Sequence, residues 1–146
     1  MPGRPVILML AGEVSGDLHG SRVARALKKR WPSASLVGLG GERMAAEGVE
    51  LLAGLDELAV MGFVEILSHL PFFWRLERRI TARLDQDDVD LVLAIDYPGL
   101  NLRIARKARE REIPVLYYVA PQVWAWKARR ARRLARDAER IAVILP

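Results

Sequence analysis

The chain has 146 residues, of which 51% are hydrophobic and 28% charged, a composition typical of one globular domain and not of a disordered chain. It contains no cysteine, which excludes a disulfide framework and thiolate metal sites and is expected of a protein from a reducing cytosol. The net charge is +5, and the whole surplus lies between Lys127 and Arg140, where seven basic residues accompany two acidic ones. Such a basic helix is either a solvated surface or a contact for phosphates, an anionic membrane or nucleic acid.

Short apolar runs alternate with helical patterns along the chain. Continuous apolar runs predict buried strands, and apolar positions three or four residues apart predict helices. The predicted strands are 6–10, 36–39, 91–95, 115–119 and 141–145, and the predicted helices are 18–30, 42–47, 100–112 and 126–137. Strands that alternate with helices and are apolar on both faces predict a doubly wound parallel sheet. Because such a domain usually continues after an apolar strand, we expect the natural protein to extend beyond Pro146.

The segment from Leu58 to Trp74 is unusually rich in large apolar side chains, and Arg75, Arg78 and two more arginines follow it closely. It is interrupted by polar residues and is too short to span a bilayer. An apolar surface beside a basic one suits contact with a membrane interface. A helix that packs on a sheet has the same pattern, so both interpretations stay open.

The first predicted strand runs into the sequence Ala11-Gly12-Glu13-Val14-Ser15-Gly16-Asp17. Small residues at the carboxyl end of a strand let a ligand approach the backbone, and open α/β sheets bind ligands at that edge. The glycine spacing matches neither a Walker loop nor the dinucleotide fingerprint. The carboxylates of Glu13 and Asp17 would repel a phosphate and suit sugar hydroxyls better, although Asp17 alone can also serve as a helix cap.

Asp96 directly follows the third predicted strand. A carboxylate at the carboxyl end of a buried strand costs desolvation free energy unless it is paired or functional. Asp96 is therefore our best candidate for a general base, and the alternative is a structural aspartate bonded to loop N–H groups. Asn101, five residues later, can cap the following helix.

Two tryptophans and a glutamine follow the next predicted strand, within Tyr118–Trp126. Aromatic faces pack against sugar rings or acyl chains, and a glutamine amide can bond hydroxyl groups. Gln122, Trp124 and Trp126 are therefore candidate substrate contacts, with core packing as the alternative for one of the tryptophans. The two histidines are isolated in the sequence, so we expect neither a metal site nor a catalytic triad.

In order and in spacing, five motifs of the chain resemble the lipid-A-disaccharide synthases. They are Ala11–Asp17, Gly40–Met44, Leu58–Glu65, Ile95–Asn101 and Tyr118–Trp126, and together they extend over essentially the whole chain. The resemblance implies that residues 1–146 are the N-terminal, acceptor-side Rossmann-like domain of a GT-B glycosyltransferase, without its C-terminal UDP-binding half. The implied reaction belongs to lipid A biosynthesis in Gram-negative bacteria. It transfers 2,3-diacylglucosamine from UDP-2,3-diacylglucosamine to 2,3-diacylglucosamine 1-phosphate, with inversion, and forms a β-1,6 bond.

The resemblance also implies roles for individual residues. Asp96 matches the base that takes the proton from the acceptor 6-hydroxyl. Met61 and its apolar neighbours would hold acyl chains or contact the membrane, and the arginine-rich helix after Trp126 would face anionic lipid or the acceptor phosphate. The full set of implied substrate-binding residues is Glu13, Ser15, Gly16, Asp17, Met61, Asn101, Gln122, Trp124 and Trp126.

The implied enzyme is cytoplasmic and peripheral on the inner membrane, with an anionic membrane surface as a partner and with no nucleic acid, metal or cofactor. One departure is that the family usually has aspartate where this chain has Gly99, so a second carboxylate near Asp96 is missing. Without the C-terminal half, we expect the chain to be inactive alone. The alternative is a non-catalytic module that binds an acylated sugar phosphate or a membrane. A nucleic-acid-binding domain is less favoured, because the aromatic residues accompany glycine loops and form no basic stacking platform.

Overall fold

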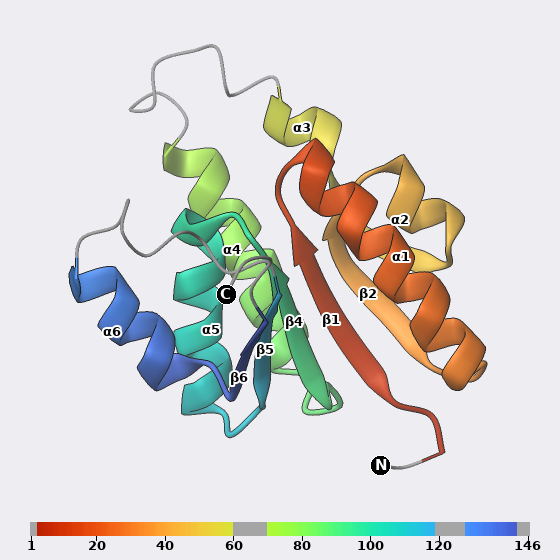
Figure 1. Ribbon diagram of the computed structural model, residues 1–146. Helices are drawn as coiled ribbons and strands as arrows, with labels where there is room; N and C mark the ends of the chain where they lie inside the picture. Colours follow the sequence, from red (N-terminus) through yellow and green to blue (C-terminus); the bar gives the residue numbers. More distant parts are fainter. Residues whose placement is uncertain (1–2, 60–69, 119–127, 143–146) are drawn as a thin grey trace.

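Six parallel strands form one sheet with the order β3-β2-β1-β4-β5-β6 in the computed structural model, which describes residues 3–59, 70–118 and 128–142 (Figure 1). The strands are Val6–Ala11 (β1), Ser35–Gly40 (β2), Val49–Gly54 (β3), Leu91–Ile95 (β4), Val115–Tyr118 (β5) and Arg140–Ala142 (β6). The chain builds β1, β2 and β3 outward in one direction and then crosses back to place β4 beside β1. The order therefore reverses between β1 and β4, and open α/β sheets bind their ligands at such a switch point.

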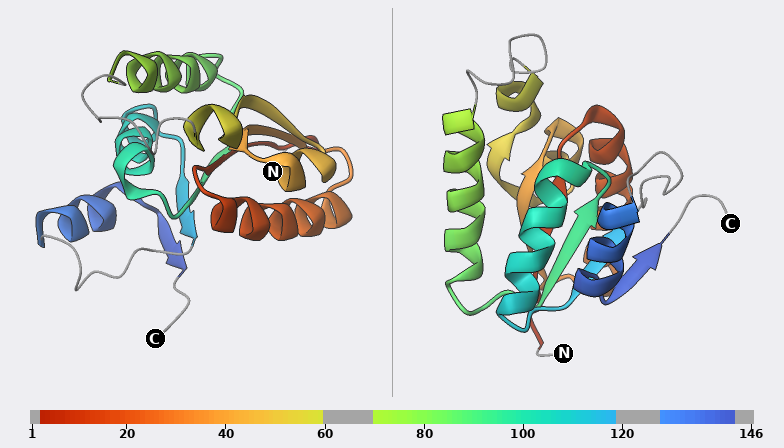
Figure 2. Two further views of the ribbon diagram at one scale, coloured as in Figure 1. Left: turned by 90° about the horizontal axis from the view of Figure 1, so that it is seen from above. Right: turned by 90° about the vertical axis from the view of Figure 1, so that its left-hand side faces the viewer.

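Helices cover both faces of this sheet, as the view from above shows (Figure 2). The helices are Val14–Arg30 (α1), Glu42–Ala46 (α2), Leu55–Ala59 (α3), Leu70–Leu84 (α4), Pro98–Glu110 (α5) and Ala128–Asp137 (α6). Helices α1 and α2 lie on one face, and α4 and α5 lie on the other with α6 beside α5. Strands β1, β2 and β4 are buried along nearly their whole length, because both of their sides face helices.

The core consists of two layers that the sheet separates. On one side, Ile7 and Met9 of β1 pack with Ala24 of α1, and on the other, Leu8 and Leu10 pack with α4 and α5. This alternation along β1 follows from the two-residue period of a strand. The fold class expected from the sequence, a Rossmann-like doubly wound sheet of the GT-B type, is confirmed.

The structure describes both ends of the apolar segment from Leu58 to Trp74, and the C-terminal end lies in α4. Leu58, at the start of the segment, is buried in the core, and Phe72 and Phe73, near its end, pack partly buried against it, so these parts of the segment cover a face of the sheet. Trp74, the last residue of the segment, is 57% exposed. Residues 60–69, which include Met61, lie outside the described residues. Within the described part of the chain, no helix has the length and apolar character needed to cross a bilayer.

Candidate active site

The two loops that leave the carboxyl ends of β1 and β4 pack directly against each other. A Cβ atom at Gly12 would lie 2.3–2.7 Å from ring atoms of Tyr97, so the tyrosine ring rests on the glycine backbone. The group that approaches the Gly12 backbone closely is thus the Tyr97 ring, and the predicted approach of a ligand to this backbone stays a prediction. Burial, and then the charge of Glu13, raises the pKa of Tyr97, so Glu13 lies near enough to this ring to be sensed by it.

The backbone of Asp96 and Tyr97 is strained. Their φ angles are +46° and +47°, which places two successive non-glycine residues in the left-handed region. Each such residue costs about 1–2 kcal/mol relative to ordinary backbone. Strain of this kind persists where the surroundings determine the conformation, and it concentrates at functional sites. Among the described residues, the turn after β4 is therefore the most unusual backbone at this edge of the sheet.

Two side chains from other elements hold the carbonyl group of Asp96. Asn101 of α5 donates from Nδ2 to the Asp96 oxygen at 2.8 Å, and the Tyr117 hydroxyl of β5 donates to the same oxygen at 2.6 Å. Burial, and then the charge of Asp96, raises the pKa of Tyr117 well above its ordinary value, so this hydroxyl keeps its proton and stays a donor. The two donors offset the strain of the left-handed turn.

Asn101 also ties the ends of β1 and β4 together. Its Nδ2 lies 3.1 Å from the Leu10 oxygen and 3.3 Å from the Ile95 oxygen, and its side chain is fully buried. Its Oδ1 has no hydrogen-bond partner among the described residues. Asn101 does not form the expected helix cap, because its side-chain amide bonds carbonyl groups at the edge of the sheet. Tyr97, the residue before α5, provides no side-chain cap either.

Asp96 is only half-buried, and its carboxylate has fewer hydrogen-bond partners than its backbone. The backbone N–H donates to the Tyr118 oxygen at 3.1 Å. Within residues 3–59, 70–118 and 128–142, the carboxylate forms no hydrogen bond or ion pair. The backbone is held on both sides while the carboxylate can accept a proton from a ligand.

A largely apolar pocket of about 430 Å³ lies beside this turn. Phe73 and Trp74 of α4, Tyr97, and the first turn of α5 supply its apolar wall. Its charged residues are Glu13, Glu77 and Arg103. A pocket with apolar walls and a few polar groups is the usual form of a small-molecule site.

Of the four candidate substrate-binding residues that closely follow β1, two are exposed and two are buried. Glu13 precedes α1 as its N-terminal flanking residue and lines the pocket, and Ser15 lies exposed on the first turn of α1. Gly16 is buried, and a Cβ atom there would lie 3.2 Å from Ala11 Cβ. Asp17 is 5% exposed. The structure thus leaves two of these four residues, Glu13 and Ser15, open to a ligand.

Asp17 is occupied by a neighbouring helix. Its Oδ1 accepts hydrogen bonds from the backbone N–H groups of Gly41 at 2.9 Å and Met44 at 3.0 Å, and its Oδ2 accepts one from Arg43 at 3.2 Å. These are the free N–H groups at the start of α2, so Asp17 caps α2 and not its own helix. Substrate contact by Asp17 stays a prediction, and a ligand would have to replace these bonds.

Gln122, Trp124 and Trp126, like Met61, lie outside the described residues, so their predicted contacts with substrate stay predictions. Sequence reasoning did not single out Tyr117 or Arg103. Both lie inside regular elements, where no local motif marks them. No group of three or more potential metal ligands gathers in the part of the chain that the structure describes.

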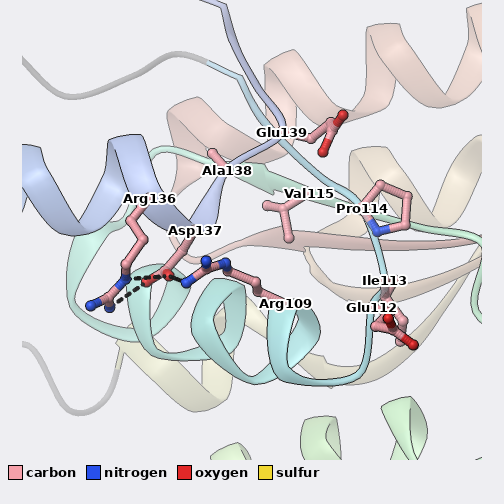
Figure 3. Close-up of a pocket in the computed structure, with 9 residues that line it drawn as sticks. All are labelled: Arg109, Glu112, Ile113, Pro114, Val115, Arg136, Asp137, Ala138 and Glu139. Atoms are coloured by element: carbon pink, nitrogen blue, oxygen red, sulfur yellow. Dashed lines mark hydrogen bonds and ion pairs between the residues drawn. The ribbon is translucent and has the colours of Figure 1, made fainter.

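A second pocket, of about 270 Å³, lies at the opposite edge of the sheet, between the C-terminal ends of α5 and α6 and the start of β5 (Figure 3). Its central carboxylate, Asp137, is bonded to Arg136 at 2.9 Å and lies 3.5 Å from Arg109. Burial alone would raise the pKa of Asp137, but the hydrogen bond and charge of Arg136, together with Arg109, lower it below its ordinary value. Because this carboxylate is already paired, the pocket around it is structural.

Comparison with known proteins identifies the family of the chain. A family model described as lipid-A-disaccharide synthetase matches residues 7–146. The chain is 44% identical over 141 residues to the lipid-A-disaccharide synthase of Syntrophotalea carbinolica, covering 96% of this chain and 36% of that protein. It is 39% identical over 146 residues to the corresponding protein of Myxococcus xanthus, covering 38% of its length. The chain therefore spans little more than a third of these relatives.

Among solved structures, the chain is similar to a putative UDP-N-acetylglucosamine 2-epimerase from Listeria monocytogenes, with a TM-score of 0.65 and 10% identity. That match covers 95% of this chain and 39% of the epimerase. A UDP-GlcNAc 2-epimerase from Neisseria meningitidis matches with a TM-score of 0.54 at 10% identity, again over 95% of this chain and 39% of the other. At this identity the likeness concerns the fold alone. The family match and the identity to the two synthases go further, and from them we conclude that the chain belongs to the lipid-A-disaccharide synthetase family.

Proposed function

We propose that this chain is the N-terminal, acceptor-side half of a lipid A glycosyltransferase and that it is inactive alone. Family membership supports the reaction class, and the curated relatives are nearly three times as long. In this proposal the rest of the protein supplies most of the UDP site. The proposed reaction transfers 2,3-diacylglucosamine from its UDP derivative to 2,3-diacylglucosamine 1-phosphate.

Asp96 is the proposed general base. Its carboxylate takes the proton of the acceptor 6-hydroxyl while that oxygen forms a bond to the anomeric carbon of the donor. The bond from that carbon to UDP breaks at the same time, UDP leaves with the electron pair, and the configuration at carbon inverts. The observation that carries this proposal is the Asp96 carboxylate, which has no partner among the described residues and is positioned at the switch point of the sheet by a strained backbone that Asn101 and Tyr117 hold.

The apolar pocket beside Asp96 supports an acylated substrate. Phe73, Trp74 and Leu100 offer the kind of surface against which acyl chains and sugar rings pack. Glu13 and Ser15 stay exposed at the same edge and would bond sugar hydroxyls. The missing carboxylate at Gly99 is not forced by crowding, because a Cβ atom there would meet nothing within 4 Å.

An arginine-lined depression between α5 and α6 supports the proposed contact with an anionic membrane surface. It has a volume of about 430 Å³ and is lined by Arg106, Arg129, Arg132, Arg133 and Arg136. Two of these five arginines have carboxylate partners, Glu110 and Asp137. So many like charges repel one another unless anions approach, and each basic residue near an anionic membrane contributes about 1 kcal/mol of binding. Such a surface would hold the enzyme peripherally on the inner membrane.

The proposed base is tested by Asp96→Asn in an enzyme that carries this chain together with the remaining length of its relatives. We expect kcat to fall by about 10²–10⁴-fold, the usual contribution of a general base, while acceptor binding changes little. The matched control is Asp87→Asn, because Asp87 is also exposed to solvent in part, has a φ of +58° and lies at the opposite edge of the sheet. Undiminished turnover by Asp96→Asn would remove Asp96 from the mechanism.

A further inference from the structure

Glu77 of α4 is a nearly buried carboxylate that two cations of α5 share. Its Oε2 lies 2.9 Å from Arg103 Nη2, and its Oε1 lies 3.5 Å from Lys107 Nζ. The Glu77 side chain is 11% exposed, whereas that of Arg103 is 54% exposed. Because one negative charge serves two positive ones, this cluster retains one net positive charge beside solvent.

Arg103 brings this positive charge to the apolar pocket beside Asp96. Among the described residues that line the pocket, Arg103 is the only cation. It lies on the second turn of α5 and therefore close to the strained turn that precedes this helix. The acidic residue from the other loop is Glu13, which follows β1. The pocket therefore combines an apolar wall, an acidic contribution from the β1 side and a basic contribution from α5.

We propose, on the basis of the function proposed above, that Arg103 binds the phosphate of an amphiphilic ligand whose apolar chain lies in this pocket. A guanidinium has five N–H donors, and Glu77 engages it through Nη2, so donors remain for a phosphate. The planar fork of arginine matches phosphate oxygens in a bidentate fashion, and such charge-assisted bonds are about twice as strong as neutral ones. Glu77 keeps the guanidinium on the α4 side of α5, at the rim of the pocket.

The same charges fix the direction of the ligand. A phosphate near Glu13 would be repelled, whereas a hydroxyl group can donate to Glu13 or to Asp96. The ligand consequently places its phosphate end at Arg103 and its hydroxyl end at the turn after β4. This orientation brings a hydroxyl, and not the phosphate, to the Asp96 carboxylate.

The test uses the chain itself and two simple amphiphiles, decyl phosphate and decyl glucoside, each below its micelle-forming concentration. Binding is followed by tryptophan fluorescence, because Trp74 lines the pocket and is exposed. The Trp74→Phe variant identifies the part of the signal that comes from the pocket. We expect the native chain to bind the phosphate amphiphile at least about tenfold more tightly than the neutral one, since a charged hydrogen bond contributes about 1.5–3 kcal/mol.

Arg103→Gln is expected to abolish that preference while leaving decyl glucoside binding within about twofold. The matched control is Arg132→Gln, which removes the same charge from the arginine-lined depression between α5 and α6. Arg103→Lys keeps the charge without the fork and should retain part of the preference, and it serves as the second variant if Arg103→Gln does not fold.

Each result has a separate meaning. Loss of the preference in Arg132→Gln but not in Arg103→Gln would overturn the proposal, because the phosphate would then lie between α5 and α6. Equal binding of both amphiphiles by the native chain would also overturn it, although the apolar pocket would stand. If neither amphiphile changed the Trp74 signal, the pocket as a ligand site would fail together with Arg103, whereas the role of Asp96 would still be decided by its own kinetic test.

Discussion

The carboxyl ends of β1 and β4 are neighbours in the sheet, yet the aspartates that follow them differ in how their carboxylates are hydrogen-bonded. After β1, Asp17 is buried and accepts three backbone hydrogen bonds from the start of α2. After β4, the carboxylate of Asp96 has no partner among the described residues, and its own backbone is held in a left-handed conformation. Both aspartates follow a buried strand within a motif of small residues, so the sequence alone gave each of them a place in the site.

The difference shows where this fold supports itself and where it keeps a group available. A buried carboxylate with three N–H donors is stable in place and has little capacity left for a ligand. A half-buried carboxylate on a strained backbone that two hydrogen bonds hold is fixed in position, and its oxygens stay available for a ligand. We therefore expect substitutions on the β1 side to change stability first, and substitutions on the β4 side to change chemistry first.

Asp17→Ala tests the β1 side and should have the largest effect on folding. Three backbone N–H groups, two of them buried, would lose their acceptor, which should lower the free energy of unfolding by about 3 kcal/mol. Urea denaturation measures this loss. The control is Glu42→Ala, which removes an exposed acidic residue from the first turn of α2, the helix that Asp17 caps. The expected change in the free energy of unfolding is about 0.5 kcal/mol. A stable Asp17→Ala protein that failed to bind acceptor would instead place Asp17 in the ligand site.

Gly12→Ala tests the contact between the two loops. The new methyl group would overlap the Tyr97 ring, so we expect a loss of about 2 kcal/mol in the free energy of unfolding. Gly99→Ala is the matched control, because its methyl group meets open space at the start of α5 and should stabilise the protein by about 0.5 kcal/mol. If both variants unfolded at the same denaturant concentration, the close packing of the two loops would be wrong.

Tyr117→Phe tests the support of the strained turn on the β4 side. Removing the hydroxyl deletes one of two bonds to the Asp96 carbonyl and should cost about 1 kcal/mol of stability. We also expect a lower kcat with little change in KM in the longer enzyme, because the base is displaced and not removed. Tyr118→Phe, in the same strand, should change neither quantity. A Tyr117→Phe enzyme with native kcat would show that this hydroxyl does not position Asp96.

Asp137→Asn extends the comparison to the opposite edge of the sheet, where the carboxylate is paired with Arg136 and Arg109 (Figure 3). Because the pKa of Asp137 is lowered in the folded protein, its ionised form stabilises the fold above the unfolded pKa of about 4, and this contribution is lost as the pH falls through the lower folded pKa. The partner arginines are half-exposed, so we expect a loss of about 0.5 kcal/mol at neutral pH. Thermal unfolding of both proteins between pH 7 and pH 3 should show this difference shrinking, and a constant difference would contradict the pairing.

Much of the fold follows from local patterns. Strand β4 was predicted with the bounds that the structure shows, because Leu91–Ile95 is a continuous apolar run between polar residues. The predicted strands did not include β3, Val49–Gly54, because Glu50 interrupts its apolar pattern. As an edge strand, β3 also needs less apolar sequence than a central one. Helix α1 begins at Val14, whereas the sequence predicted a start at residue 18. The prediction was late because glycine is a poor helix former, and the glycines near the start of α1 obscured its helical pattern.

The site was less predictable because its defining contacts join distant residues. Asp96 was recognisable from its place after an apolar strand. The bond from Asn101 to the Leu10 oxygen spans 91 residues, and the bond from Asp17 to Gly41 spans 24. No local pattern encodes such contacts, so the sequence suggested a ligand role for both side chains where the structure reveals backbone partners.

The most direct test of the acceptor-side assignment is a pair of binding titrations with this 146-residue chain. One ligand is 2,3-diacylglucosamine 1-phosphate and the other is UDP, and tryptophan fluorescence reports binding of each. The acceptor-half account predicts saturable binding of the acylated sugar phosphate and no measurable binding of UDP. Tight binding of UDP without binding of the acceptor would contradict it, because the donor site would then lie in this chain.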